Sequence, residues 1–114
     1  MKRVVITGLG AVTPIGNNVQ EYWQSLIKGF SGSFLITKFD TSKFKTKFAC
    51  EVKNFNPTIF EKNEIRKYDL FSQYALVAVD EAIRAAKIDF ENLNRNRVGV
   101  IWGAGDGGLA TFEE

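Results

Sequence analysis

The chain has 114 residues, of which 45% are hydrophobic and 25% are charged, and its formal net charge at pH 7 is +2. This length suits one small domain, and a charge so close to neutral gives no reason to expect nucleic acid as a partner. No apolar run approaches the roughly 20 residues of a membrane span, and the apolar stretch near the start is too short for a secretory signal. We therefore expect a cytoplasmic protein that does not bind a membrane.

The chain holds one cysteine, Cys50, and no histidine. A single cysteine excludes an internal disulfide framework and fits a reducing compartment. Without histidine the chain lacks the usual general base and the commonest metal ligand, so we expect neither a metal site nor a Cys–His catalytic pair. Cys50 lies in a strand-like run that offers nothing to activate a thiol, and we interpret it as a small buried core residue.

The first elements predicted are a strand and a helix. Residues 3–7 form a short, continuous apolar run of the kind found in strands buried on both faces. A helix is predicted over residues 19–27, capped by Asn17 or Asn18 and ended by Gly29. Its apolar residues recur at helical spacing and predict one stripe facing a core: Val19, Tyr22, Trp23, Leu26 and Ile27.

The middle of the chain predicts an extended ribbon and then a long helix. Residues 30–42 are irregular, residues 43–52 partly alternate like an exposed strand, and Pro57 can open a helical turn. Residues 64–87 are the longest helical candidate. We expect this helix to be deeply buried, because five alanines would let a neighbour approach closely: Ala75, Ala78, Ala82, Ala85 and Ala86.

Residues 97–102 read as a second buried strand, and a helix is predicted from Leu109 onward. Two strands of parallel type with a helix between them predict α/β layering. Two such strands cannot close a core, so we expect that residues 1–114 are part of a domain and that the rest of its sheet lies elsewhere.

The segment Gly103–Gly108 satisfies the pattern G-x-G-x-x-G between a predicted strand and a predicted helix. That is the context of a dinucleotide-binding turn, and a nucleotide-binding oxidoreductase is therefore one hypothesis. Asp106 argues against it, because a carboxylate would stand inside a loop meant to hold phosphates. The first glycine turn fails the pattern, since Thr13 stands where the third glycine belongs.

Five phrases, in order along the chain, together resemble the type II β-ketoacyl-acyl carrier protein synthases, the elongating condensing enzymes of the thiolase-like superfamily. They span residues 3–17, 39–42, 47–56, 66–69 and 97–108. The resemblance implies a thiolase-like α/β/α layered fold, of which residues 1–114 would be a partial N-terminal β-ketoacyl synthase domain. It also implies decarboxylative condensation of acyl-enzyme with malonyl-acyl carrier protein, without a cofactor, in fatty-acid elongation.

In the family, the catalytic cysteine and two histidines lie well past the point that corresponds to residue 114. None of the catalytic residues is therefore expected in this chain, Cys50 matches no part of the catalytic motif, and the 114 residues alone are expected to be inactive. A non-catalytic member of the same fold, a chain-length factor, stays open as a further alternative. The residues following 114 would separate the synthase, the chain-length factor and the oxidoreductase.

The resemblance also implies a carrier-protein site. Arg66 and Lys67 match positions that contact the acidic acyl carrier protein, and Lys62 could supply a neighbouring charge, although Asn63 occupies the matching position. Residues 38–69 carry eight basic and five acidic side chains, which agrees with an acidic partner but also with a solvated surface. The family forms homodimers, and the resemblance implies one here.

The turn Gly105–Asp106–Gly107 matches the part of the family that approaches the acyl pocket. An apolar residue is usual at the position of Asp106, and an unpaired carboxylate in an apolar channel is costly. Our hypothesis is that the enzyme has a shortened or unusual acyl pocket, or that Asp106 turns away from it.

Overall fold

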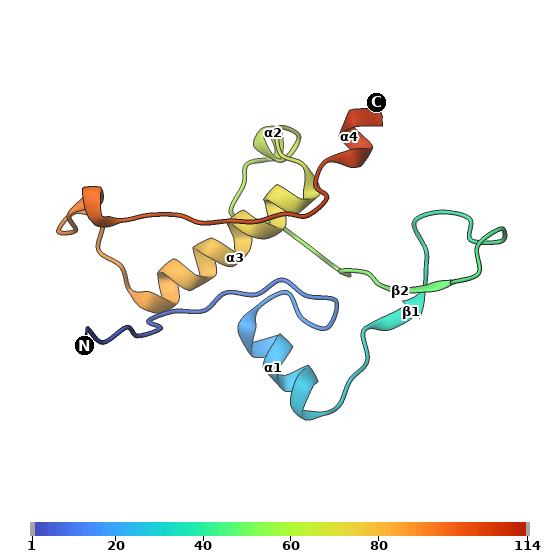
Figure 1. The fold of residues 1–114 in the computed structure, drawn as a ribbon, viewed down its shortest axis with the longest axis horizontal. Helices are drawn as coiled ribbons and strands as arrows, with labels where there is room; N and C mark the ends of the chain where they lie inside the picture. Colours follow the sequence, from blue (N-terminus) through green and yellow to red (C-terminus); the bar gives the residue numbers. More distant parts are fainter. Residues whose placement is uncertain (1, 114) are drawn as a thin grey trace. The chain divides into compact units, whose positions relative to one another are not determined.

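The computed structural model describes residues 2–113, without the side chains of residues 62 and 110. These residues divide into two compact units, residues 11–56 and residues 2–10 with 57–113. The smaller unit contains α1 (Val19–Ile27), β1 (Ser33–Leu35) and β2 (Phe48–Cys50). The other contains α2 (Lys62–Ile65), α3 (Leu70–Ala86), the 3₁₀ helix η1 (Arg95–Arg97) and α4 (Leu109–Glu113) (Figure 1).

Helix α1 begins and ends as the sequence predicts. Asn18 is the N-cap, and its Oδ1 accepts a hydrogen bond of 2.8 Å from the backbone N–H of Glu21. The Glu21 carboxylate in turn accepts from the N–H of Asn17 at 2.9 Å, so two otherwise unpaired donors are satisfied. At the other end Gly29 adopts a left-handed φ of 64°, and the N–H of Phe30 reaches back to the carbonyl of Ser25. The predicted helix and its caps are confirmed. The prediction that its apolar stripe faces a core is wrong for the described residues, since no residue of α1 is buried and Trp23 and Ile27 are each 60% exposed.

Strands β1 and β2 pair antiparallel, with Phe34 opposite Ala49, and form the sheet of the smaller unit. The exposed ribbon predicted over residues 43–52 is confirmed by β2, whereas β1 lies where the sequence predicted irregular structure. The prediction of a buried Cys50 is wrong, since its free thiol is exposed in β2. A two-stranded sheet has two open faces, and within this unit nothing covers the side on which Cys50 lies.

The loop between these strands is closed at its base by the hydroxyl of Thr37, which donates to Glu51 at 2.7 Å. This hydrogen bond lowers the pKa of Glu51. Farther out, the backbone N–H and the hydroxyl of Ser42 both donate to Asp40 and lower its pKa. The turn over residues 39–42 is therefore fixed by its own side chains.

The long helix predicted over residues 64–87 is interrupted. Helix α2 ends at Ile65 and α3 begins at Leu70, because Asp69 is in an extended conformation with a ψ of 154°. The side-chain amide of Gln73 donates to the carbonyls of Ile65 and Tyr68, at 3.2 and 2.9 Å. These bonds satisfy backbone acceptors that a continuous helix would have paired internally, and so they stabilise the break.

The predicted close approach to the alanines of α3 is confirmed by the chain segment that precedes residue 11. A Cβ added to Gly10 would overlap the carbonyl of Ala78, and one added to Gly8 would overlap the carbonyl of Ala82 and lie 2.9 Å from the Cβ of Ala86. Two glycines thus bring one backbone directly against another, which no residue with a side chain would allow.

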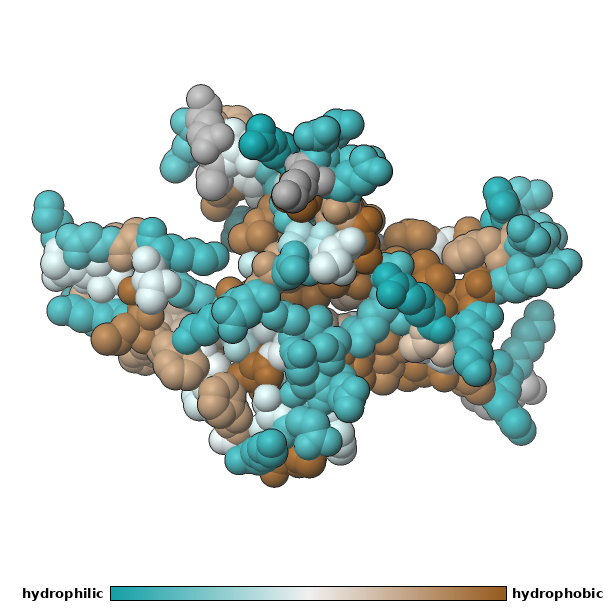
Figure 2. Space-filling view, turned by 180° about the vertical axis from the view of Figure 1, so that it is seen from behind, coloured by the Kyte–Doolittle hydropathy of each residue, from teal (hydrophilic) through white to brown (hydrophobic). Residues whose placement is uncertain are grey.

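Deep burial of α3 is wrong for the described residues, among which Gln73, 9% exposed, is buried and no hydrophobic side chain is. Residues 3–7 and 97–102, predicted as buried strands, are also exposed and belong to no described sheet; Ile101 is 100% exposed. A strand is buried only when neighbours pair with its edges and cover its faces, and residues 2–113 provide no such neighbour. Figure 2 shows the resulting apolar side chains at the surface.

Among the described residues, none of the helices combines the length and the apolar composition that crossing a membrane requires.

The contact between residues 8–10 and α3 predicts an asymmetry between glycines. We expect Gly10→Ala to lower the free energy of unfolding by about 1–3 kcal/mol, because the new methyl group meets a backbone carbonyl that cannot move aside. The matched control is Gly99→Ala, whose added Cβ meets nothing within 4 Å and should change the stability by less than about 0.5 kcal/mol. Urea unfolding of the two variants measures this difference, and equal values would contradict the contact.

Candidate functional site

The turn before α4 is held by side chains from the start of α3. A Cβ added to Gly107 would lie 2.9 Å from the ring of Phe71, and one added to Gly108 would lie 2.7 Å from Oδ2 of Asp69. Gly108 also has a left-handed φ of 73°. The hydroxyl of Thr111, on α4, donates to Oδ1 of Asp69. Asp69 therefore contacts both the last residue of the turn and the helix that follows it.

These groups border an open hollow of about 620 Å³. The surface of the hollow is mainly apolar, and its lining combines the Asp69 carboxylate with Leu109 and Phe112. A second hollow of about 420 Å³ lies between α3 and the extended segment at residues 100–102, and its lining is almost entirely apolar. In Figure 1 this segment crosses α3. Both hollows are large enough for part of an acyl chain.

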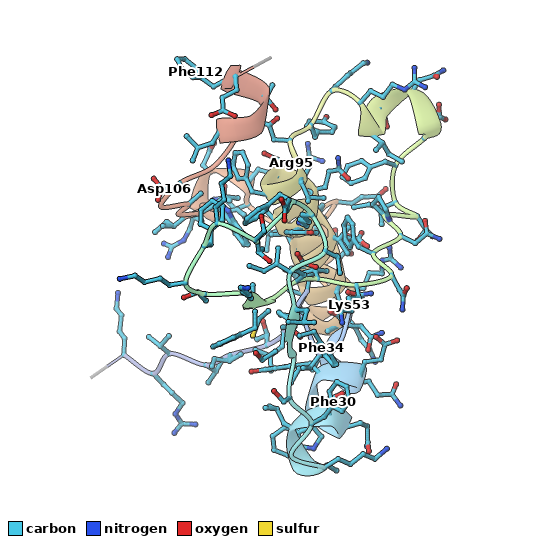
Figure 3. The ribbon with its side chains drawn as sticks, turned by 90° about the vertical axis from the view of Figure 1, so that its right-hand side faces the viewer. Phe30, Phe34, Lys53, Arg95, Asp106 and Phe112 are labelled. Carbon is cyan, nitrogen blue, oxygen red and sulfur yellow. The ribbon has the colours of Figure 1, made fainter. Side chains whose placement is uncertain are left out.

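The three residues predicted to border the pocket differ in what surrounds them. Gly107 contacts Phe71, whereas an added Cβ at Gly105 would meet nothing within 4 Å. Asp106 is exposed, and in Figure 3 it lies at the edge of the loop. Its carboxylate is thus solvated in the described part of the chain.

Two of the predicted carrier-protein residues lie in the break between α2 and α3. Arg66 is the C-cap of α2, Lys67 follows it, and both side chains are exposed. The sequence placed them at the start of a helix, which is wrong, since the helix that continues the chain begins only at Leu70. Asn63 is exposed as well, and the side chain of Lys62 lies outside the described part of the structure. Arg66 stands three residues before Asp69, so the predicted carrier-protein segment leads directly into the group that holds the turn.

In the smaller unit, two of the phrases that carry the family resemblance meet. The side-chain amide of Asn17 donates to the carbonyl of Lys53 at 2.8 Å. The Nζ of Lys53 lies 3.4 Å from the ring centroid of Phe34, a cation–π contact visible in Figure 3. Together with Phe30, these residues border an open hollow of about 410 Å³.

The geometry argues against a pyrophosphate at the turn. A phosphate would have to approach the N–H groups at the start of α4, where the Asp69 carboxylate already lies next to Gly108 and Thr111. A second negative charge at that place would be repelled. Among residues 2–113 there is also no cluster of three or more side chains of the metal-binding types.

Comparison with known proteins shows the family to which the chain belongs. The sequence profile of the beta-ketoacyl synthase N-terminal domain matches residues 1–114. The chain belongs to the β-ketoacyl synthase family. Its helices and two-stranded sheet are those of part of an α/β fold.

Two relatives of this β-ketoacyl synthase chain are named 3-oxoacyl-[acyl-carrier-protein] synthase 2. The protein of Staphylococcus aureus is 46% identical over 113 residues, and that of Synechocystis sp. is 46% identical over 114 residues. The matches cover 98% and 99% of this chain and 27% of each relative. The chain thus spans about a quarter of the length of these relatives.

Two solved structures share the fold of this chain. The ishigamide ketosynthase/chain length factor has a TM-score of 0.65 and 34% identity, over 78% of this chain and 22% of that one. A type II polyketide acyl carrier protein in complex with its ketosynthase bound to the hexaketide has a TM-score of 0.61 and 31% identity, over 84% and 25%. Both titles name a ketosynthase, so the similarity of fold agrees with the family.

Sequence reasoning missed the group that holds the turn. Asp69 belongs to the family phrase at residues 66–69, but the sequence pattern assigns it no function, because the helix predicted over residues 64–87 runs through it. The signal was present: an aspartate directly before an apolar helical run is a typical helix start. Thr111 carried no such signal, since its partner lies 42 residues away in the sequence.

The turn predicts which of its glycines tolerate a side chain. We expect Gly107→Ala to lower the free energy of unfolding by about 1–3 kcal/mol, because its methyl group would press on the Phe71 ring. In the control Gly105→Ala the methyl group meets open space, and a gain of up to about 1 kcal/mol is expected from the stiffer unfolded chain. Thermal unfolding of both variants tests this, and a costly Gly105→Ala would contradict the described turn.

Proposed function

We propose that this chain is the N-terminal part of a longer 3-oxoacyl-[acyl-carrier-protein] synthase with a thiolase-like α/β/α fold. The observation that carries the proposal is the 46% identity to synthase 2 relatives through nearly the whole chain. The exposed apolar segments at residues 3–7 and 97–102 support it, since they have the composition of central strands and would pair with strands of the remaining sequence.

The proposed reaction is a decarboxylative Claisen condensation. An acyl group is transferred from its carrier protein to a cysteine of the enzyme, and two histidines polarise the thioester of malonyl-carrier protein. Loss of CO₂ leaves a carbanion, which attacks the acyl thioester and expels the cysteine thiolate, giving 3-oxoacyl-carrier protein. The cysteine and histidines would lie beyond residue 114, and no cofactor is needed.

Within the present chain, the proposal assigns two binding roles. Arg66 and Lys67, with Lys62 nearby, would attract the acidic acyl carrier protein; both described side chains are exposed and therefore accessible. Gly105, Asp106 and Gly107 would border the acyl pocket, next to the apolar hollows of the larger unit. The enzyme would act as a cytoplasmic homodimer.

A chain-length factor remains the second candidate, because one neighbour's title joins a ketosynthase with a chain length factor. Such a protein would share the fold and lack the catalytic cysteine. The synthase is favoured because the relatives with 46% identity are named as synthases.

The proposal predicts that the full-length protein releases CO₂ and forms 3-oxoacyl-carrier protein from acyl- and malonyl-carrier protein, whereas residues 1–114 alone form none. Mass spectrometry of the carrier protein detects the product. Arg66→Glu should raise the KM for carrier-bound substrates about fivefold, since it replaces an attraction by a repulsion. It should leave acyl-pantetheine substrates unaffected. The control is Arg95→Glu, an equal charge reversal at another exposed arginine.

Asp106 predicts a restricted chain length. If this carboxylate borders the acyl pocket, Asp106→Ile should extend the range of accepted acyl chains, because an apolar side chain removes the cost of desolvating a charge. The measurement is kcat/KM of the full-length enzyme over a ladder of acyl lengths. A long-chain preference that is the same before and after the substitution would show that Asp106 turns away from the pocket.

A further inference from the structure

We propose that Asp69 is a positioning residue that fixes the acyl-pocket turn to the carrier-binding segment, an inference that rests on the function proposed above. The juxtaposition is one carboxylate between two predicted sites: Arg66 and Lys67 precede it in the chain, and Gly108 and Thr111 contact it in space. Asp69 would touch neither the substrate nor the reacting atoms, and its effect would be exerted through the turn.

Both oxygens of the Asp69 carboxylate lie against the turn or the helix that follows it. Oδ1 accepts from the hydroxyl of Thr111, and Oδ2 occupies the space that a side chain at Gly108 would need. The ring of Phe71, two residues further along, presses on Gly107 in the same way. Two consecutive residues of the turn, Gly107 and Gly108, therefore pack against Phe71 and Asp69 at the start of α3.

The segment proposed to bind the carrier protein is also held in place by hydrogen bonds. Gln73 is buried, and its side-chain amide donates to the carbonyls of Ile65 and Tyr68, while its backbone N–H donates to the backbone carbonyl of Asp69 at 3.0 Å. Residues 65–68, which include Arg66 and Lys67, are thus held at both ends by hydrogen bonds from Gln73.

This arrangement fixes the wall of the proposed acyl pocket relative to the segment proposed to bind the carrier protein. Without the bond to Asp69 the turn would be free to shift, and long acyl chains, which reach the wall, would be affected more than short ones. A residue that only stabilised the fold would affect all chain lengths alike.

The experiment uses the full-length enzyme and two pairs of variants. Thr111→Val and Asp69→Ala remove the bond, whereas Thr111→Ser keeps the hydroxyl and Asp69→Asn keeps one carbonyl oxygen. Asp80→Ala is the matched control, because it removes a carboxylate of α3 that pairs with Arg84, away from the turn. For each variant, kcat/KM is measured over a ladder of acyl lengths, on the carrier protein and on pantetheine.

We expect Thr111→Val and Asp69→Ala to lower kcat/KM about tenfold for the longest accepted chains and less than twofold for the shortest, with either acyl donor. Thr111→Ser should be close to wild type, and Asp69→Asn should recover part of the loss. An unchanged profile, or an equal loss at every chain length, overturns the proposal. If Thr111→Val does not fold, the Asp69 pair decides by the same comparison. A wild-type protein that forms no 3-oxoacyl product would instead refute the proposed function itself.

Discussion

The larger unit is organised by the close contact between the backbone of residues 8–10 and α3. Glycine on one side and alanine on the other reduce the distance between the two main chains to the least that their atoms allow. This contact fixes α3 against the start of the chain, and the residues at the beginning of α3 then hold the turn before α4. Everything predicted to bind a ligand in this unit therefore depends on where α3 lies.

The break before α3 gives Asp69 an extended backbone conformation that a continuous helix would not allow. It releases Asp69 from helical geometry and directs its carboxylate to Gly108 and Thr111. A carboxylate at that point is incompatible with a phosphate at the start of α4 and compatible with an acyl pocket, whose ligand is uncharged at its far end. The same residue thus argues against the dinucleotide hypothesis that the glycine-rich pattern had left open.

Predictions from the sequence were correct where the signal is local. Helix α1 begins after Asn18 and ends before Gly29, because the hydrogen bonds at both ends join residues no more than five positions apart. Helix α4 begins at Leu109, as predicted. The predictions were wrong for residues 66–69, where helical composition is overridden by the side chain of Gln73. Burial was also wrong for Cys50 and for the two apolar segments, because burial depends on covering elements that composition cannot supply.

The sequence by itself determined the family, because five phrases in fixed order are specific even though each is weak alone. It also determined the helix caps, the small-residue face of α3 and the position of the glycine turn, all of which follow from neighbours along the chain. Only the tertiary structure decided that Asp69 and Thr111 meet across 42 residues, and that a side chain added at Gly107 or Gly108 would meet Phe71 or Asp69 while one at Gly105 would meet nothing. The physical reason is that such contacts arise when distant segments are packed together, and packing is a property of three-dimensional position.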